Sequence, residues 1–485
     1  MAASPMTPPW SLHLAPGMAE DLMGHLFPGD GDEHGAVLGV SVVETGRGVR
    51  LLGRRLYLGE DGVDYVPGTR GYRMLTATFV RDRILECERE GLGYFAVHCH
   101  GGTDRVAFSR EDMASHERGY PALLGILGDQ PVGALVFTQD AVAGDIWLPD
   151  GRRTELDHAR LLGSTMRELR AGHTAAVASA DPTFDRQSRL FGDCGQAVLA
   201  RQKVGVIGAG GAGSLVVEYL ARLGVGHLVV IDPERIATTN LPRVVGSRRL
   251  DAWPWLTEPS RPALLRKLGE CISTPKVKIA GRVAKQTSPK IHVEAIQGDV
   301  TREAVAECLI DCDYLFLAAD SAQARLVVNG IVHQYLIPGV QLGAKVQLGD
   351  NARVLDIFSV VRPMIPGEGC LWCNRLISPA RLQEEALTPE QRRQQRYVAD
   401  DNVQAPSVIT LNAVAAAHAV NDYLLATVGL TNPSGERRWF RFHPIAPSAT
   451  DRVVFEQPRR DIACGECGDV GRLAAGRVRR LPVST

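Results

Sequence analysis

The N-terminal third of the chain carries histidines and carboxylates at the spacing of a metal site. The run VHCHGGTDRVAFSREDM places His98 and His100 at alternate positions, followed by the S-x-x-D pair Ser109 and Asp112. On a strand, alternate side chains share one face, so the two imidazoles would lie together. Two imidazoles, a carboxylate and a water make a catalytic zinc site, and Glu33 further upstream could be its general base. The alternative is that Ser109 and Asp112 only stabilise the start of a helix.

Four cysteines in the C-terminal part form two C-x-x-C pairs. Cys370 and Cys373 make the first pair, and Cys464 and Cys467 make the second. Four thiolates at such spacings are the ligands of a tetrahedral structural Zn²⁺ ion. A thioredoxin-like redox pair would need only one C-x-x-C near a βαβ start, and four buried reduced thiols are the other alternative. We expect a structural zinc site that does no catalysis.

A glycine-rich turn in the middle of the chain is typical of a nucleotide site. Gly208, Gly210 and Gly213 follow the apolar run VGVIGA and open a helix-like segment. Glycines there let the backbone approach phosphates, whose charge is favoured by a helix N-terminus. The default interpretation of this G-x-G-x-x-G is a dinucleotide-binding Rossmann unit, in which Asp232 at the end of HLVVID takes the ribose hydroxyls.

The residues after Asp232 favour a triphosphate over a redox cofactor. Asn240 and Arg243 come in DPERIATTNLPR, Lys276 follows in STPKVKIA, and Asp320 ends the strand-like run YLFLAAD. A nicotinamide cofactor has no obvious use for these groups, so Arg243 and Lys276 argue against an oxidoreductase. Arginine, lysine and a carboxylate at the C-terminal edge of one sheet suit ATP and Mg²⁺.

Taken in order, these motifs resemble a known superfamily. FDRQSRLFG, GAGGAG, the D-x7-NLxR run, PKV and the AAD strand end are similar to the ThiF/MoeB and ubiquitin-activating enzymes, which adenylate the C-terminal glycine of ubiquitin-like proteins. The resemblance implies that Asp232 binds ribose and that Asp320 binds Mg²⁺. It assigns the ATP phosphates to Asn240, Arg243 and Lys276. It also implies that Arg186 of FDRQ reaches into the site of a second protomer, hence a homodimer; the alternative is a surface ion pair.

The resemblance also implies a zinc site at the place of the two C-x-x-C pairs, but a catalytic cysteine is missing. Many members pass the activated carboxyl group to a cysteine after the first pair, and no cysteine occurs between residues 374 and 463. Val403 in DDNVQAPSVITLN stands near the matching place. Either the protein only adenylates, or Ser407 forms an oxyester, although Ser407 after a proline could instead be a helix cap. The remaining candidates are expected to be small core residues: Cys87, Cys194, Cys271, Cys308 and Cys312.

The N-terminal motif resembles the JAMM (JAB/MPN) metalloproteases over roughly residues 32–150. The resemblance implies that the zinc ligands are His98, His100 and Asp112. It implies that Glu33 activates the water and that Ser109 helps to stabilise the oxyanion. The sequence departs from the family in two places: Gly101 stands where a proline usually follows the second histidine, and the next loop is about one residue longer. Asp32 is adjacent to Glu33 and could take its place as the general base.

Composition and charge exclude several classes of protein. The 485 residues are 45% hydrophobic and 22% charged, with a formal net charge of −1. Such a globular composition creates no field that would recruit nucleic acid or an anionic membrane. The first residues lack a basic region followed by an apolar run, and no apolar stretch is long enough to span a bilayer. We therefore expect a soluble, cytoplasmic protein.

We expect an α/β chain of two domains. Residues 1–165 would form an α+β JAB/MPN domain, and residues 184–485 a Rossmann-like ThiF adenylation domain with a mostly parallel, doubly wound sheet. Residues 166–183, rich in Ala, Ser and Thr, would link them. Residues 250–270 resemble an insertion of no evident function, and the charged segment 383–395 is expected to be an exposed helix or loop.

The combined expectation is a bifunctional enzyme of bacterial ubiquitin-like conjugation. The C-terminal domain would adenylate a ubiquitin-like protein, and the N-terminal domain would mature it or cleave it from targets. A conjugating-enzyme-like protein is a possible further partner. One alternative is activation of a sulfur carrier for cofactor or amino-acid synthesis. An alternative of another class is a non-catalytic scaffold that binds a ubiquitin-like protein.

Overall fold

The chain divides into two compact units. The first contains residues 1–177 together with residues 334–336 and 469–480, and the second contains the rest of the chain. The computed structural model describes residues 8–68, 73–163, 165–172, 181–349, 353–387, 406–431 and 438–484.

An eight-stranded sheet forms the first unit. Its strand order is β1-β3-β2-β4-β5-β6-β7-β8, and β1 also pairs with β7, so the row of strands closes on itself. The pairings of β4 with β5 and of β1 with both neighbours are parallel, and the others are antiparallel. The strands are β1 (Trp10–Leu14), β2 (Gly35–Thr45), β3 (Gly48–Leu58), β4 (Gly93–Cys99), β5 (Val132–Phe137), β6 (Val142–Trp147), β7 (Arg153–Leu161) and β8 (Arg167–Leu169).

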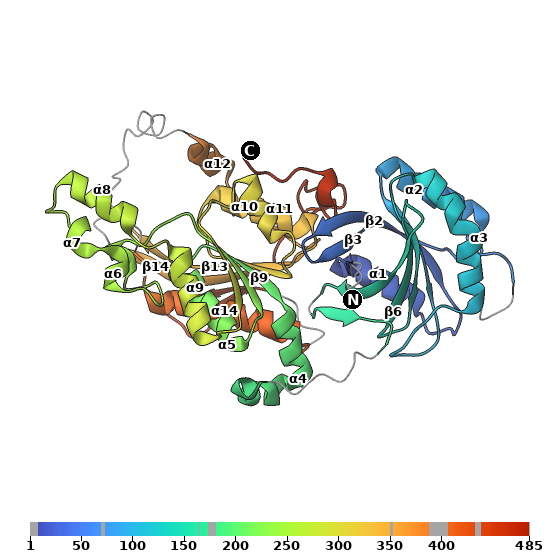
Figure 1. Cartoon of the computed structure of the whole chain (residues 1–485), viewed down its shortest axis with the longest axis horizontal. Coiled ribbons are helices and arrows are strands. Elements are labelled where there is room, and N and C mark those ends of the chain that lie inside the picture. The colour runs from blue at the N-terminus through green and yellow to red at the C-terminus, as the bar shows by residue number, and fades with distance from the viewer. Residues whose placement is uncertain are drawn as a thin grey trace, which may run out of the picture. The chain divides into compact units, whose positions relative to one another are not determined.

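Helices cover both faces of this sheet because its strands alternate buried side chains between two cores. On β2, Leu38 belongs to the core that includes α1 (Pro16–Leu26), whereas Val37 belongs to the core that includes α2 (Ala77–Glu90) and α3 (Arg110–Leu127). Figure 1 shows α2 and α3 packed beside each other. The first unit therefore has the α+β character that the sequence predicts.

The boundaries of the first unit differ from the expected ones. Arg167–Leu169 forms β8, so part of the expected linker 166–183 belongs to the sheet, while residues 173–180 lie outside the described residues. The C-terminal segment 469–480 also belongs to this unit. There the carbonyl oxygens of Gly471 (3.2 Å) and Leu473 accept hydrogen bonds from the Arg54 guanidinium on β3. A pairing between residues so distant in the chain leaves no local pattern in the sequence.

A second eight-stranded sheet organises the second unit. Its order is β11-β10-β9-β12-β13-β14-β15-β16; the pairings from β11 to β13 are parallel and those from β13 to β16 are antiparallel. The predicted doubly wound parallel sheet is thus present, but its antiparallel extension was not expected. The strands are β9 (Lys203–Ile207), β10 (His227–Ile231), β11 (His292–Ile296), β12 (Tyr314–Leu317), β13 (Gly339–Leu348), β14 (Val354–Met364), β15 (Trp439–Phe442) and β16 (Val453–Glu456).

Helices lie on both faces of the second sheet, as a doubly wound fold requires. Figure 1 shows α5, α9 and α14 on one side of it and α10 and α11 on the other. The expected insertion 250–270 contains α7 and most of α6 and α8. None of the helices in the described ranges has the length and apolar character needed to cross a membrane. The helices are α4 (Asp185–Arg201), α5 (Gly211–Leu223), α6 (Arg249–Ala252), α7 (Pro254–Thr257), α8 (Ala263–Ile272), α9 (Lys276–Thr287), α10 (Glu303–Ala306), α11 (Ala322–Gln334), α12 (Pro379–Ala386) and α14 (Ile409–Thr427).

Candidate functional sites

The first unit brings together the three residues predicted to hold a zinc ion. His98 lies on β4, His100 directly follows this strand, and Asp112 lies in the first turn of α3. His98 Nε2 is 3.2 Å from His100 Nε2, and Asp112 Oδ2 is 3.6 Å and 3.5 Å from these two nitrogens. Ligand atoms about 2.0–2.2 Å from a tetrahedral zinc ion are about 3.3–3.6 Å apart, so the three atoms fit around one ion. We call these residues the His-His-Asp set.

Ser109 holds Asp112 in place at the start of α3. Ser109 is the N-cap: its hydroxyl accepts from the Asp112 N–H at 3.1 Å, and Asp112 Oδ2 accepts from the Ser109 N–H at 2.8 Å and from the hydroxyl at 2.7 Å. The helix-cap arrangement is therefore compatible with metal binding. Burial would raise the pKa of Asp112, but hydrogen bonds from His100, His98 and Ser109 hold that pKa well below its usual range. In this arrangement the Ser109 hydroxyl donates to Asp112, so its predicted oxyanion role requires that bond to open.

The pairing of β2 with β4 brings Glu33 to the His-His-Asp set. These strands are antiparallel with Gly35 opposite His98, so the chain before β2 runs beside the end of β4 where His100 lies. The pKa of His100 is raised, mainly by its hydrogen bond to Asp112 and further by the charge of Glu33. Within the described part of the chain, no hydrogen bond or ion pair holds the Glu33 carboxylate. Glu33 is therefore available to act on a group at this site.

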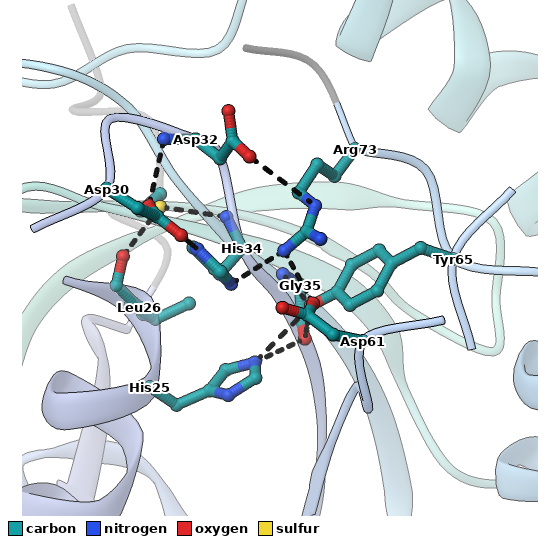
Figure 2. Close-up of polar contacts among 10 residues, drawn as sticks. His25, Leu26, Asp30, Asp32, His34, Gly35, Asp61, Tyr65 and Arg73 are labelled. Carbon is teal, nitrogen blue, oxygen red and sulfur yellow. Dashed lines mark hydrogen bonds and ion pairs between the residues drawn. The ribbon is translucent and has the colours of Figure 1, made fainter. Parts of the chain in front are cut away.

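The acids that flank Glu33 are engaged elsewhere (Figure 2). Asp30 Oδ2 accepts a hydrogen bond from His34 Nε2 at 2.9 Å, and Asp32 Oδ2 lies 3.9 Å from Arg73 Nε. The sequence left Asp32 as an alternative to Glu33. Because the Asp32 carboxylate faces Arg73, Glu33 is the stronger candidate for a general base.

The loop after His100 contains both departures from the JAMM pattern that the sequence resembles. Gly102 has a φ of +115°, a conformation that favours glycine. At Gly101 φ lies outside that region and a Cβ would meet no atom within 4 Å, so the fold leaves room for a side chain there. The Thr103 carbonyl accepts from the Thr138 hydroxyl at 2.7 Å and from the Asp140 N–H at 2.8 Å, which anchors the longer loop to the turn between β5 and β6.

The second unit brings the four predicted cysteines into one cluster. Cys370 Sγ is 3.9 Å from Cys464 Sγ, Cys373 Sγ is 3.6 Å from Cys467 Sγ, and all four sulfurs lie within 4.8 Å of one another. A tetrahedral zinc ion with bonds of about 2.3 Å separates its sulfurs by about 3.8 Å, so the cluster fits zinc. Backbone N–H groups donate to Cys370 and Cys464, each at 3.4 Å, which orients two of the ligands.

The glycine-rich turn has the geometry of a phosphate site. Gly208 has a φ of +94°, and a Cβ there would lie 3.0 Å from the backbone of Ala318 after β12. A Cβ at Gly213 would collide with the Gly208 carbonyl oxygen. Gly210 is the N-cap of α5, and a Cβ there would meet nothing within 4 Å. Two of the glycines thus allow close packing, and the third leaves open space at the helix N-terminus, where phosphate binds.

Asp232 and Lys276 lie together at the end of β10. The buried Asp232 carboxylate accepts from the N–H groups of Ala209 at 2.7 Å and Glu234 at 2.8 Å. Burial raises the pKa of Asp232, and the nearby Lys276 ammonium opposes that rise. Lys276, the first residue of α9, forms an ion pair with the Glu234 carboxylate. Since the Glu234 side chain is 67% exposed, a phosphate could replace it at Lys276.

Asn240 and Arg243 lie in the segment that follows β10, and Arg243 reaches the glycine-rich turn. Asn240 Oδ1 accepts from the Ala237 N–H at 3.1 Å and so closes the short turn before NLPR. The Cδ atom of Arg243 lies 3.4 Å from the position that a Cβ would take at Gly211, the first residue of α5. Arg243 therefore lies beside the N-terminus at which a phosphate would bind.

Two further charged residues lie near Asp320, which the sequence placed at the magnesium site. Asp320 follows β12 and is exposed, and no hydrogen bond or ion pair among the described residues holds its carboxylate. Its charge acts on Arg325 of α11, whose pKa burial nevertheless lowers. Glu385 of α12 accepts from the N–H groups of Ala322 at 2.8 Å and Gln323 at 2.9 Å, and so caps α11. Sequence analysis missed both: the short spacing after Asp320 could have indicated Arg325, but no local signal points to Glu385.

Three other predicted positions have different outcomes. Arg186 is exposed on α4, and its role across a dimer stays a prediction, since the structure contains one chain. Ser407 is not the helix cap, because Val408 is the N-cap of α14; the Ser407 hydroxyl accepts from Asn412 Nδ2 at 3.2 Å. Val403 lies outside the described residues.

The expectation of small core cysteines holds only in part. Cys87 and Cys312 are buried and Cys308 is half-buried, but Cys194 and Cys271 are exposed, so the expectation is wrong for these two. Burial raises the pKa of Cys87 to about 12, which makes it a poor nucleophile. Cys194 and Cys271 lie in α4 and α8, on helix faces that stay exposed among the described residues.

A third group of possible metal ligands lies at the amino ends of β10 and β11. His227, His292 and Glu294 offer ligand atoms within 4.8 Å of one another. However, Glu294 Oε1 lies 3.1 Å from the Lys203 ammonium and 2.7 Å from His227 Nε2. A lysine charge at this distance opposes a cation, so we assign the group to an ion-pair network of the sheet.

Comparison with known proteins identifies the family of the second unit. Residues 184–453 match the model of the ThiF family. SAMP-activating enzyme E1 of Haloferax volcanii is 30% identical over 160 residues, which is 32% of this chain and 52% of that protein. Sulfur carrier protein adenylyltransferase of Thermus thermophilus is 32% identical over 148 residues, 30% of this chain and 47% of that protein. The chain thus spans about half the length of these relatives.

Two more matches cover a larger part of the chain. Sulfur carrier protein ThiS adenylyltransferase of Escherichia coli is 27% identical over 266 residues, 54% of this chain and 88% of that protein. A crystal structure of E. coli MccB overlaps with 59% of this chain and 72% of that chain, at 18% sequence identity and a TM-score of 0.43.

Proposed function

The chain belongs to the ThiF family, whose model matches residues 184–453, and on this basis we propose that its second unit adenylates a ubiquitin-like or sulfur-carrier protein with ATP and Mg²⁺. In this reaction an oxygen of the carrier's C-terminal carboxylate attacks the α-phosphorus of ATP. The bond from that phosphorus to the bridging oxygen breaks, and pyrophosphate leaves with the negative charge. Positive groups fixed around the phosphates before the reaction lower the barrier.

One observation supports this function best: the glycine-rich turn lies beside three parts of the proposed site. Its Gly211 lies beside Arg243, its Ala209 N–H donates to Asp232, and its Gly208 packs on Ala318, just before Asp320. The contacts of this turn with Arg243, with Asp232 and with the strand end before Asp320 support a single nucleotide site at the N-terminus of α5.

The cationic and anionic side chains of this site would have different roles. Arg243 and Lys276 would bind the phosphates, with Asn240 holding the turn between the strand end and Arg243. Asp320 is exposed and carboxylate oxygen is the ligand that Mg²⁺ prefers. The ion would neutralise charge on the leaving pyrophosphate. Arg186 would complete the site of a second protomer in a homodimer.

For the first unit we propose a zinc-dependent peptidase that cleaves after the carrier's C-terminal glycine. The His-His-Asp set fits a tetrahedral ion with one open position, which would polarise a water and the scissile carbonyl. Glu33 would take the proton from the water and deliver it to the leaving amine. Ser109 would donate to the developing oxyanion after releasing Asp112. Such an activity would mature the carrier or remove it from targets.

The four-cysteine cluster would hold a second, structural zinc ion. With no cysteine between residues 374 and 463, we propose that the adenylate passes directly to a nucleophile of a partner protein. That partner would be a conjugating-enzyme-like protein or, in the alternative pathway, a sulfur donor. A non-catalytic scaffold is the remaining alternative, but the complete set of polar groups in both sites favours catalysis.

Incubation with ATP, Mg²⁺ and glycine-ended carriers tests the adenylating function. Mass spectrometry should find a carrier heavier by one AMP, and removal of the terminal glycine from that carrier should abolish the adduct. Pyrophosphate release without any carrier adduct, across ubiquitin-like and sulfur-carrier proteins alike, would reject the proposal.

A further inference from the structure

The segment that carries Glu33 is held by side chains from two other parts of the first unit (Figure 2). Helix α1 contributes His25, and the connection between β3 and α2 contributes Asp61, Tyr65 and Arg73. His25, Tyr65 and Arg73 contact residues on either side of Glu33, and Asp61 contacts Arg73. The Glu33 carboxylate has no partner among the described residues. The arrangement thus fixes the backbone around Glu33 and not its functional group.

Arg73 is the centre of this arrangement. Its Nη1 lies 2.7 Å from Asp61 Oδ1 and 3.3 Å from His34 Nδ1, and its Nε lies 3.9 Å from Asp32 Oδ2. The guanidinium also stacks over the Tyr65 ring, 4.5 Å from its centroid. Arg73 therefore contacts both residues adjacent to Glu33. It also contacts Asp61 and Tyr65, which lie with Arg73 in the connection between β3 and α2.

The contact with Arg73 defines the hydrogen-bonding state of His34. A guanidinium only donates, so the Nδ1 atom of His34 must be the acceptor. The hydrogen of the neutral imidazole is then on Nε2, which donates to Asp30 Oδ2 at 2.9 Å. The His34 side chain is buried, with 5% of its surface exposed, so this Asp30–His34–Arg73 chain has little freedom to rearrange.

Hydrogen bonds with Tyr65 and His25 hold Gly35, two residues after Glu33. Its N–H donates to the Tyr65 hydroxyl at 3.0 Å, and its carbonyl accepts from that hydroxyl at 3.1 Å and from His25 Nε2 at 3.0 Å. Because Gly35 lies opposite His98, these bonds also fix the register of β2 beside the His-His-Asp set.

We propose that Arg73 is a positioning residue that holds Glu33 at the His-His-Asp set; this inference rests on the peptidase function proposed for the first unit. Arg73 contacts Asp32 and His34 and thereby prevents Glu33 from turning away or exchanging places with Asp32. It touches neither the set nor a reacting atom. A general base misplaced by about 1 Å can lower the rate by about a hundredfold. Arg73→Ala should therefore lower kcat about tenfold to a hundredfold and leave KM almost unchanged.

The test uses the full zinc-loaded chain and a peptide that ends in Gly-Gly with a C-terminal aminomethylcoumarin amide. Arg73→Lys should recover part of the lost kcat, because lysine keeps the charge but cannot contact Asp32, His34 and Asp61 together. Arg152→Ala is the matched control: its side chain is 73% exposed and pairs with Asp150. A double variant, Glu33→Ala with Arg73→Ala, should be no slower than Glu33→Ala alone, because the two residues act in one step.

A second readout does not depend on turnover. In protein with zinc at the cysteines and cobalt at the His-His-Asp set, Arg73→Ala should retain one cobalt. It should also shift the pH midpoint of the visible spectrum in the same direction as Glu33→Ala. If the wild type cleaves the peptide but Arg73→Ala matches it in kcat and midpoint, the positioning role is overturned and the peptidase stands. If the wild type cleaves nothing while the midpoints still shift together, the peptidase is rejected and the positioning role stands.

Discussion

Gly35 at the start of β2 lies directly opposite His98 of β4, and this pairing brings Glu33 to the end of the sheet that carries His100. Two segments that are far apart in the sequence thereby supply the candidate base and the candidate ligands of one site. The register of this antiparallel pair thus supports the peptidase site that we propose for the first unit.

Removal of one histidine tests the metal site of the first unit. His98→Ala should lower the zinc content by one equivalent and leave the cysteine site filled, because the remaining two ligands bind zinc too weakly. Metal analysis of the purified protein measures this directly. His292→Ala is the matched control and should retain all zinc, since Lys203 opposes a cation in its group. Full zinc content in His98→Ala would reject the site.

Loss of the zinc ion proposed at the four-cysteine cluster should destabilise the second unit. Cys373→Ser removes one of four ligands, so the protein should lose one equivalent of zinc and unfold at a lower temperature, by about 2–4 °C for each kcal/mol lost. Cys308→Ser, a half-buried cysteine outside the cluster, is the control. Calorimetry with and without a chelator gives the comparison. An unchanged Tm in Cys373→Ser together with retained zinc would contradict the assignment.

Hydrogen bonds to the buried Asp145 carboxylate should determine part of the acid stability of the first unit. Burial by itself would raise the pKa of Asp145, but hydrogen bonds from His116, Arg153 and Trp147 lower that pKa to about 2. A depressed pKa in the folded state means that this network stabilises the fold above pH ~4, the ordinary range of the carboxyl group, and that the stabilisation disappears as the pH falls towards 2.

Asp145→Asn should therefore destabilise the protein at neutral pH by roughly 1–2 kcal/mol and flatten the loss of stability between about pH 4 and 2. Urea unfolding at several pH values measures both effects. Asp129→Asn, at an exposed aspartate between α3 and β5, should change neither. If the unfolding free energy of Asp145→Asn depends on pH as steeply as that of the wild type, other carboxyl groups determine the loss of stability between about pH 4 and 2, and the role of Asp145 is rejected.

Glu385 should affect ATP binding through α11. Its carboxylate accepts from two N–H groups at the start of that helix, directly after Asp320. Glu385→Ala leaves these groups without their cap, at a cost of about 1 kcal/mol, and should raise the KM for ATP a fewfold by loosening the loop that carries Asp320. The neighbouring exposed Glu384→Ala is the control. An identical KM in both variants would reject this role.

The sequence predicted those parts of the sites that local patterns encode. The alternation of His98 and His100, the cap spacing of Ser109 and Asp112, and the turn at Gly208 follow from residues that are close along the chain. The same holds for most predicted strands, because continuous or alternating apolar runs report burial directly. The match over residues 184–453 confirms the family indicated by the motifs of the second unit.

The remaining features depend on contacts between distant residues. Glu385 lies 63 positions from the helix that it caps, and Arg73 lies 39 positions from His34. Neither pair has a spacing that a helix or strand period would reveal. The same reason applies to β8, to the antiparallel extension of the second sheet and to the C-terminal segment 469–480. Burial of a single cysteine is equally non-local, which explains the wrong expectation for Cys194 and Cys271.

Carrier-dependent exchange of radiolabelled pyrophosphate into ATP tests the central proposal most directly. The wild-type protein should exchange only when a cognate glycine-ended carrier is present. Asp320→Ala should lower the rate by at least a hundredfold, because charge on the leaving pyrophosphate is no longer neutralised. Asp451→Ala, at an exposed aspartate between β15 and β16, should exchange at the wild-type rate. Undiminished exchange in Asp320→Ala would contradict the account.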